Sequence, residues 1–486
     1  MLKFIVKLHP EIAIKSKSVR KRFTKLLEKN IKLILLRKDE KVRVKNNWDN
    51  IAVETDISDA QTREWFIDNL KRVPGIVQFI EVQETPFETI DDIYQRTLEL
   101  ASHTIEGKTF CVRVKRNGNH DFTSTDVERY VGGGLNQNVE GAKVKLSKPE
   151  VVVKIEIKKD LAYIVTHTHY GIGGFPLPTQ EDVLSLISGG FDSGVATYQM
   201  MRKGARTHFL FFNLGGAAHE IGVKQVSHYL WKQFSSTHKV KFITVDFEPV
   251  VAEILENVEN GQMGVVLKRM MMRAGAAVAE KVNAHALITG ESVGQVSSQT
   301  LANLSVIDRV TETLILRPLI QHDKADIIKI AREIGTVEMA ESMPEYCGVI
   351  SQKPTVKAKM SKILEEEAKF DFDVLDTVIK NATVKDIREI EEEAKEEVKE
   401  AETVSELPEN AVVLDIRSPE EEDANPLELE GVEVEHIPFF RLATKFGDLP
   451  QDKEYYLYCA RGVMSQLQAL ILHENGYMNV KVYRPE

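Results

Sequence analysis

The region from residue 183 to about residue 340 constrains the fold most strongly, because it alternates short apolar segments with longer helical ones. Strands are predicted at 183–187, 208–212, 240–245 and 286–289, and helices near 192–203, 217–234 and 264–282. Strands that are apolar along nearly their whole length and are separated by helices are typical of a parallel sheet covered on both faces. We therefore predict an α/β domain in the middle of the chain.

A six-residue loop, Ser-Gly-Gly-Phe-Asp-Ser at 188–193, directly follows the first of these strands and opens a helix. Backbone N–H groups in such a turn, together with the positive end of the helix, form a cradle for phosphate. Walker-type loops add a lysine for the β- and γ-phosphates, whereas this loop has none. Asp192 suits another task, the orientation of pyrophosphate and its magnesium ion. The loop resembles the PP-loop of ATP pyrophosphatases, which attack the α-phosphate and release pyrophosphate.

Further polar residues follow the later elements of this region. Lys268 and Arg269 lie near the start of a helix, and Gly290-Glu291-Ser292 follows a strand and leads to a polar segment ending at Gln299. Ligands in open α/β sheets bind at the carboxyl ends of the strands. Taken singly, a lysine on a helix is usually solvated and a glycine after a strand is usually a turn.

The N-terminal region differs in charge from the rest of the chain. Residues 1–50 contain 15 Lys and Arg against 5 Asp and Glu, a net charge of +10. Because the whole chain has a net charge of −11, the remaining residues carry −21. A strand at 2–8, a basic amphipathic helix at 17–37, two short strands, a helix and a further strand at 76–82 fit a small ferredoxin-like α+β domain. A basic module on an acidic chain suggests contact with phosphate, although a solvated helix face is the alternative.

The C-terminal region begins with an acidic segment. Residues 385–406 contain 10 acidic and 4 basic residues, which predicts a solvated helix leading to a tether. Short strands at 411–416, 434–437 and 455–458 then predict another small α/β domain. The whole chain is thus expected to be multidomain, mixing α/β and α+β parts.

The three cysteines, Cys111, Cys347 and Cys459, are too few and too scattered for a disulfide framework or a cysteine zinc site. No apolar run approaches the roughly 18 residues that cross a bilayer, so we expect a cytoplasmic protein without membrane contact. Cys111 lies in an alternating strand and is expected in a core. Cys459 follows the apolar strand at 455–458 and precedes a helix, where successive N–H groups and Arg461 favour a negative charge on sulfur.

Several separate motifs in the right order resemble the tRNA 4-thiouridine synthetase family, also called the thiamine biosynthesis sulfurtransferase family, in its long form. The resemblance covers essentially the whole chain. It rests on SGGFDS (188–193), FFNLGG (211–216), LKRMMMR (267–273), TGESVGQVSSQT (289–300), LRPLIQHDK (316–324), MPEYCGV (343–349) and YCARGVMS (458–465). It implies a transferase that uses ATP to activate the uridine at position eight of tRNA and replaces its oxygen with sulfur.

The resemblance also implies an order of domains. We expect a ferredoxin-like domain at 1–60, a THUMP RNA-binding domain at 61–168, a linker at 169–182, a PP-loop adenylation domain at 183–384, an acidic helical linker at 385–406 and a rhodanese-like domain at 407–486. The partners it implies are tRNA, a cysteine desulfurase as sulfur donor and a sulfur carrier protein of thiamine synthesis.

Roles for individual residues follow from the same motifs. The ATP site would consist of Leu186, Ile187, Ser188, Gly189, Gly190, Asp192, Ser193, Lys268, Gly290 and Gln299, with magnesium as a second cofactor. Asp192 and Lys324 would support activation of the uridine. Cys459 would carry the persulfide in a loop with Arg461 and Gly462, and Cys347 would become its disulfide partner.

Two alternatives of other classes stay open at this point. A PP-loop ligase acting on a small molecule, with its tail serving as a protein sulfur carrier, explains 188–193 but leaves the basic N-terminal region without a role. A pure RNA-binding module leaves residues 188–193 without one.

Overall fold

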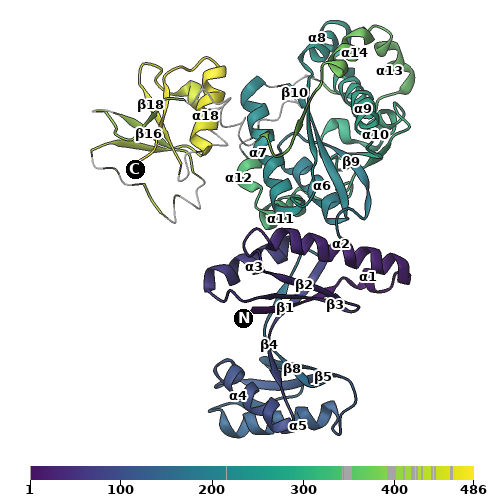
Figure 1. The fold of residues 1–486 in the computed structure, drawn as a ribbon. Helices are drawn as coiled ribbons and strands as arrows, with labels where there is room; N and C mark the ends of the chain where they lie inside the picture. Colours follow the sequence, from purple (N-terminus) through teal and green to yellow (C-terminus); the bar gives the residue numbers. More distant parts are fainter. Residues whose placement is uncertain are drawn as a thin grey trace. The chain divides into compact units, whose positions relative to one another are not determined.

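The computed structural model describes residues 2–485 except 215, 342, 344–352, 391–400, 409–410, 418–421, 423–424, 428, 430, 439–441, 443–444 and 460–462. These residues divide into two compact units, one of residues 1–179 with 202–204 and one of residues 180–201 with 205–486. Figure 1 shows the elements of each, coloured along the chain. No helix within the described ranges is long and apolar enough to span a bilayer.

The first unit is built on one sheet of eight strands in the order β2-β3-β1-β4-β8-β7-β5-β6. The strands are β1 (Leu2–Leu8), β2 (Arg43–Asn47), β3 (Asn50–Thr55), β4 (Ile76–Pro86), β5 (Thr109–Asn117), β6 (Lys143–Val144), β7 (Val151–Lys158) and β8 (Leu161–Tyr170). The helices are α1 (Pro10–Ala13), α2 (Lys17–Leu35), α3 (Ala60–Arg72), α4 (Ile90–Ile105) and α5 (Ser124–Asn138). Each predicted strand and helix of this region is present.

Two large hydrophobic cores lie along this sheet, besides a small cluster of Ile5, Ile80 and Val82. The first joins α2, α3 and strands β1, β3 and β4, and includes Phe66 and Phe79; the second joins α4, α5 and strands β5, β7 and β8. The boundary predicted at residue 60 falls inside the first core, because α3 and the start of β4 pack on it. The ferredoxin-like part therefore extends to about residue 79, later than the sequence suggested.

The basic face predicted for α2 is exposed. The helix buries Phe23, Leu27 and Ile31, while Lys21, Lys25, Lys29 and Lys32 lie on the solvent side. Arg20 is the exception: its guanidinium donates to the Trp48 carbonyl and the Asp49 carboxylate at 2.7 and 3.0 Å. Since a row of unburied lysines is the usual electrostatic footprint of phosphate recognition, this face suits a nucleic-acid backbone.

The second unit contains the parallel sheet that the central region predicts. Its six strands run in the order β13-β12-β9-β10-β11-β14, and only the edge strand β14 is antiparallel to its neighbour. The strands are β9 (Gln180–Leu186), β10 (Ala205–Asn213), β11 (Lys241–Asp246), β12 (Ala286–Ile288), β13 (Leu314–Leu316) and β14 (Thr383–Asp386). The helices are α6 (Phe191–Arg202), α7 (Gly216–Phe234), α8 (Glu248–Asn257), α9 (Met263–Val282), α10 (Leu301–Asp308), α11 (Lys324–Ile334), α12 (Val337–Glu341), α13 (Met360–Glu367) and α14 (Phe372–Lys380).

A buried ion pair ties α9 to α13 beside this sheet. The side chains of Arg269 and Glu367 are only 3% and 5% exposed, and they meet through two hydrogen bonds of 2.6 and 3.0 Å. Arg269 also donates to the carbonyl of Val306 at 2.5 Å. Because a buried guanidinium without a carboxylate is costly, the pair fixes how these helices meet.

Replacing Glu367 with alanine should therefore destabilise this domain by about 3–5 kcal/mol. The loss is expected because Arg269 keeps its burial and loses its counter-charge. Calorimetric unfolding of the full chain measures it, with Glu365→Ala as the matched control. Glu365 lies on the same helix with 67% of its side chain exposed, so its replacement should change stability by less than about 0.5 kcal/mol.

The C-terminal part of the second unit carries a five-stranded parallel sheet in the order β15-β19-β18-β16-β17. Its strands are β15 (Thr403–Val404), β16 (Val412–Asp415), β17 (Glu433–His436), β18 (Tyr455–Tyr458) and β19 (Val480–Tyr483), and α18 (Val463–Glu474) follows β18. The expectation of a small α/β domain here is confirmed.

The acidic segment 385–406 differs from the predicted helical linker at both ends. Its first two residues belong to strand β14, which pairs with β11, and Thr403–Val404 pairs with β19. Ala401 is buried in the C-terminal core. Strand pairing at two open sheet edges therefore replaces the predicted helix at both ends of the segment, and the β-branched Thr403 and Val404 suit a strand. Residues 391–400 lie outside the described part of the chain.

Candidate active site

The order of strands places the Ser188–Ser193 loop at a switch point of the central sheet. Strand β9 pairs with β10 on one side and with β12 on the other, both parallel to it. The chain leaves β9 toward β10 and returns later to β12, so the loops after β9 and β12 diverge at the same carboxyl edge. A crevice at such a point is where open α/β sheets bind ligands.

The loop is held in its turn by its own hydroxyls and by glycine. Gly189 has a φ of +83°, a left-handed conformation that glycine adopts at no steric cost. The Ser193 hydroxyl donates to the carbonyl of Gly190 and accepts from the backbone N–H of Ser188, both at 3.2 Å. Leu186 ends strand β9, and the N–H of Ile187 donates to the Leu210 carbonyl at 2.9 Å. The predicted phosphate cradle is thus a rigid turn.

His219, at the start of α7, packs against the same loop and was not singled out from the sequence. Its Nε2 donates to the carbonyl of Ser188 at 3.2 Å. Burial lowers the pKa of His219, and the bond to Ser188 offsets this only in part. Burial therefore favours the neutral imidazole, which holds the loop through its bond to the Ser188 carbonyl.

Gly290 touches the loop from the neighbouring strand. A Cβ placed on Gly290 would lie 2.5 Å from the carbonyl carbon of Asp192 and 2.6 Å from the backbone nitrogen of Ser193. Both contacts are to backbone atoms, so the loop itself would have to move.

We expect Gly290→Ala to weaken binding of a phosphate ligand such as ATP by about 10- to 100-fold, because displacements near 1 Å have effects of that size. Isothermal titration with ATP measures the change. Gly264→Ala is the control, since a Cβ there meets nothing within 4 Å. Equal ATP affinity in both variants would contradict this role of the close approach.

Asp192 and Lys324, both expected to support activation, lie in contact although they are far apart in the sequence. The Lys324 ammonium lies 3.1 and 3.2 Å from the two carboxylate oxygens of Asp192. Gln295 adds a third contact, since its Nε2 donates to Asp192 Oδ2 at 2.8 Å. Gln295 belongs to the segment after β12, and its position against Asp192 is not visible in the sequence, where it is one of several polar residues in irregular chain.

Lys268 and Gln299 each approach the residues that directly follow Gly290. Gln299 Oε1 accepts from the backbone N–H of Ser292 at 3.2 Å. The Lys268 ammonium lies 3.9 Å from the Glu291 carboxylate. Lys268, Gly290 and Gln299 therefore meet around residues 289–299, while the Ser188–Ser193 loop contacts Gly290 directly.

The predicted sulfur residues are described only in part. Cys459 follows β18 and its Sγ accepts from the backbone N–H of Ser465, in the first turn of α18, at 3.4 Å. Cys347, Arg461 and Gly462 lie outside the described residues. Met343 lies four positions before Cys347 and close to the loop. A Cβ added to Gly189 would lie 2.8 Å from the Met343 side chain. Cys111 is buried in the core, as predicted.

A buried ion pair supports the strand beside Cys459. Asp415, the last residue of β16, accepts from Arg417 at 2.5–3.1 Å, and both side chains are buried. The Arg417 guanidinium lies over the ring of Tyr458, 5.2 Å from its centre. This pair therefore stiffens the carboxyl edge from which Cys459 emerges.

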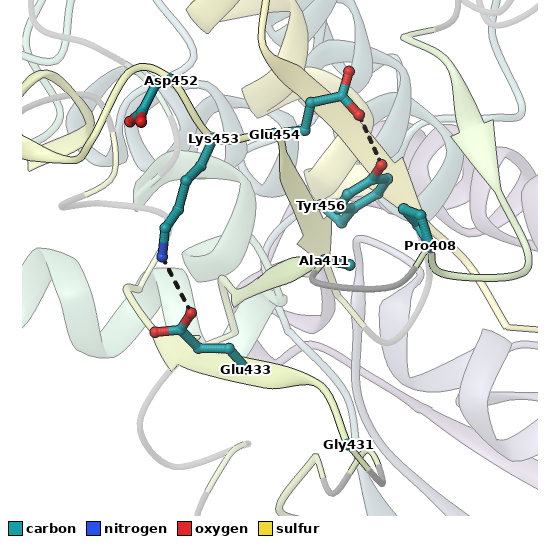
Figure 2. Close-up of a pocket in the computed structure, with 8 residues that line it drawn as sticks. All are labelled: Pro408, Ala411, Gly431, Glu433, Asp452, Lys453, Glu454 and Tyr456. Atoms are coloured by element: carbon teal, nitrogen blue, oxygen red, sulfur yellow. Dashed lines mark hydrogen bonds and ion pairs between the residues drawn. The ribbon is translucent and has the colours of Figure 1, made fainter.

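A cavity of about 680 Å³ lies in the same C-terminal part but at the other edge of its sheet (Figure 2). Its walls come from the segments just before and at the start of β16, β17 and β18, including Ala411, Glu433 and Tyr456. Cys459 follows the carboxyl end of β18, so the cavity does not serve that thiol. Across the described residues, no group of three His, Cys, Asp or Glu side chains is placed to hold a metal ion.

Three family descriptions match the chain. Residues 3–79 match the ThiI ferredoxin-like domain, residues 87–167 the THUMP domain and residues 178–372 the thiamine biosynthesis protein (ThiI). The first match ends where the first hydrophobic core ends.

Similar proteins extend over the whole chain. It is 63% identical to the tRNA sulfurtransferase of Colwellia psychrerythraea over 484 residues, which cover 100% of both chains. The tRNA sulfurtransferase of Aliivibrio fischeri strain MJ11 is also 63% identical with the same coverage. Among solved structures, a 4-thiouridine synthetase–RNA complex with bound ATP has a similar fold, with a TM-score of 0.70 and 24% identity over 79% of this chain and 99% of that one.

Proposed function

This chain belongs to the tRNA sulfurtransferase family, and we propose that it uses ATP to convert the uridine at position eight of tRNA into 4-thiouridine. The observation that carries this proposal is the lysine-free Ser188–Ser193 loop with the Asp192–Lys324 pair across it. Such a site suits attack at the α-phosphate of ATP and release of pyrophosphate.

Activation precedes sulfur transfer in this scheme because the carbonyl oxygen of uracil is a poor leaving group. Its attack on the α-phosphate of ATP forms an adenylated uridine and pyrophosphate. The backbone N–H groups of the loop, with Lys268 and Lys324, would stabilise the negative charge that develops on the phosphates. Leu186, Ile187, Gly290 and Gln299 form the remaining wall of the proposed ATP site.

Magnesium fits this site as a second cofactor. A magnesium ion commonly binds through one or two carboxylates plus substrate phosphates and keeps several waters. Asp192 supplies one carboxylate beside the loop, with its side chain 24% exposed. The ion would neutralise phosphate charge, while Gln295 keeps the carboxylate oriented.

Cys459 is the proposed carrier of sulfur, in a C-terminal domain that we assign as rhodanese-like. Its parallel sheet, the thiol at the carboxyl edge and the N–H donation from Ser465 support this assignment. An anionic sulfur is stabilised at a helix N-terminus. A cysteine desulfurase is the proposed source of the sulfane sulfur, which would arrive as a Cys459 persulfide.

Cys347 is the proposed second thiol. The terminal sulfur of the Cys459 persulfide attacks C4 of the adenylated uridine and displaces AMP. The Cys347 thiolate then attacks Cys459 Sγ, so that 4-thiouridine leaves and a Cys347–Cys459 disulfide forms. The sulfane sulfur gains two electrons from the two cysteines, and a thiol reductant restores them.

The first unit is the proposed tRNA-binding part. The exposed lysines of α2 and the match of residues 87–167 to the THUMP domain support this role. We place the reaction in the cytoplasm, because tRNA and ATP are there and free thiols persist in a reducing compartment. Sulfur transfer to a carrier protein for thiamine synthesis is a second proposed duty, favoured by the match to the thiamine biosynthesis protein.

Mass spectrometry of tRNA tests the proposal directly. The purified chain is incubated with unmodified tRNA, ATP, magnesium, cysteine and a desulfurase, and the nucleosides are analysed. We expect 4-thiouridine and one AMP for each thiolated base. Pyrophosphate release that needs no tRNA would favour a small-molecule ligase instead, and absence of both AMP and thiolated base would end the proposal.

A further inference from the structure

Glu291 lies in the centre of the segment that meets the phosphate loop and has no assigned role. It directly follows Gly290, where an added Cβ would clash with the loop backbone, and it is 2% exposed. A buried carboxylate is expensive unless its oxygens are paired, so each contact of this side chain is informative.

One oxygen of this carboxylate is well satisfied. Glu291 Oε2 accepts from the Thr289 hydroxyl at 3.0 Å and from the Arg317 Nε at 2.9 Å. Arg317 in turn donates to the exposed Asp308 carboxylate at 2.5 and 3.1 Å. These bonds hold the Oε2 side of the Glu291 carboxylate in place.

The other oxygen is different. Glu291 Oε1 is buried and accepts no hydrogen bond from any described residue. A cation nevertheless lies beside it, the Lys268 ammonium at 3.9 Å. That distance is longer than a hydrogen bond but short enough for a strong charge interaction in a partly buried site. A small rotation of the lysine side chain would bring a donor onto Oε1.

We propose that Glu291 is a positioning residue that directs the ammonium of Lys268 toward the phosphates of ATP. This inference rests on the proposed function of the loop. Lysine has a long flexible side chain with three donors on one point charge. A hydrogen bond to Glu291 Oε1 would fix the direction of the ammonium and remove part of the rotational freedom that ATP binding would otherwise have to restrict.

The competing explanation is that Glu291 serves only to anchor Arg317. The two explanations differ in whether the effect of removing the Glu291 charge depends on Lys268. If anchoring is the role, the effect of losing the Glu291 charge is independent of Lys268. If positioning is the role, the effect depends on the lysine being present.

A double-mutant cycle on ATP binding separates them. Titration calorimetry of the full chain compares wild type, Glu291→Gln, Lys268→Met and the double variant. We expect Glu291→Gln to raise the Kd for ATP by about 10-fold in the wild-type background and by less than about 2-fold when Lys268 is already methionine. Asp308→Asn, which removes the far end of the same network, should stay within about 2-fold of wild type.

A second variant covers the case in which Glu291→Gln does not fold. Glu291→Asp keeps the charge but shortens the reach, and it should weaken ATP binding through the same dependence on Lys268. An equal loss of affinity with and without Lys268, or no loss in either Glu291 variant, would overturn the inference. A wild-type chain that binds no ATP at all would instead refute the proposed function.

Discussion

A Cys459→Ser chain should release pyrophosphate from ATP in the presence of tRNA at a near wild-type rate and yet form at least about 1,000-fold less 4-thiouridine. A serine hydroxyl cannot hold a sulfane sulfur, whereas the adenylation site is built from residues of the central sheet. The Ser465 N–H donates to Cys459 Sγ at 3.4 Å in the wild type. In the variant only the serine oxygen is there to accept this bond.

Parallel assays of pyrophosphate release and of thiolated nucleoside measure the two halves separately. Cys111→Ser is the matched control, because Cys111 is buried in the core of the first unit and is not expected to carry sulfur. Thiolation by Cys459→Ser at the wild-type rate would remove this residue from the mechanism. Loss of pyrophosphate release as well would show that the two halves are not separable.

The third thiol should behave differently. With a persulfide donor and no added thiol reductant, Cys347→Ser should stall after sulfur delivery and before the first 4-thiouridine is released, because the intermediate joined to Cys459 has no internal thiol to resolve it. Single-turnover and multiple-turnover thiolation distinguish these cases. A wild-type multiple-turnover rate without added reductant would contradict the disulfide scheme.

The architecture was largely predictable because each part has a regular signature. The apolar strands at 183–187 and 286–289 predict the parallel sheet, which the structure confirms, and the loop at 188–193 lies at the carboxyl edge of that sheet. The C-terminal strands ending at 458 likewise placed Cys459 after a buried strand.

What escaped prediction depends on contacts between distant segments. The sequence predicted a domain boundary at residue 60, but the apolar side chains Phe66 and Phe79 place helix α3 and strand β4 in the first core. Glutamate-rich sequence favours helix, yet residues 385–386 and 403–404 complete two sheet edges.

The candidate site likewise combines residues that sequence motifs identified with contacts that the sequence did not indicate. Gly290 and Lys324 were identified through motifs that the chain shares with a family. The contacts of Gln295 with Asp192 and of Arg317 with Glu291 join irregular segments, and neither periodicity nor turn chemistry in a single sequence indicates such a pairing.

The geometry around Asp192 leads to the second large effect. Its carboxylate is the only group seen, among the described residues of the loop 188–193, to contact both Lys324 and Gln295. Without Lys324 a carboxylate beside bound phosphates would be repelled by them, so the pair allows one negative charge to remain where magnesium and pyrophosphate need it.

Asp192→Asn should therefore reduce tRNA-dependent pyrophosphate release by about 100- to 1,000-fold, the scale on which a lost electrostatic contact at a reacting group acts. The amide keeps the size of the side chain, so affinity for tRNA should stay within about 2-fold and unfolding should be unchanged. Asp326→Asn, an exposed carboxylate on the same helix as Lys324, controls for the loss of one negative charge in the neighbourhood. Pyrophosphate release at the wild-type rate by Asp192→Asn would mean that the loop needs only its N–H groups, and the charge of Asp192 would then have to be explained by its pairing with Lys324 alone.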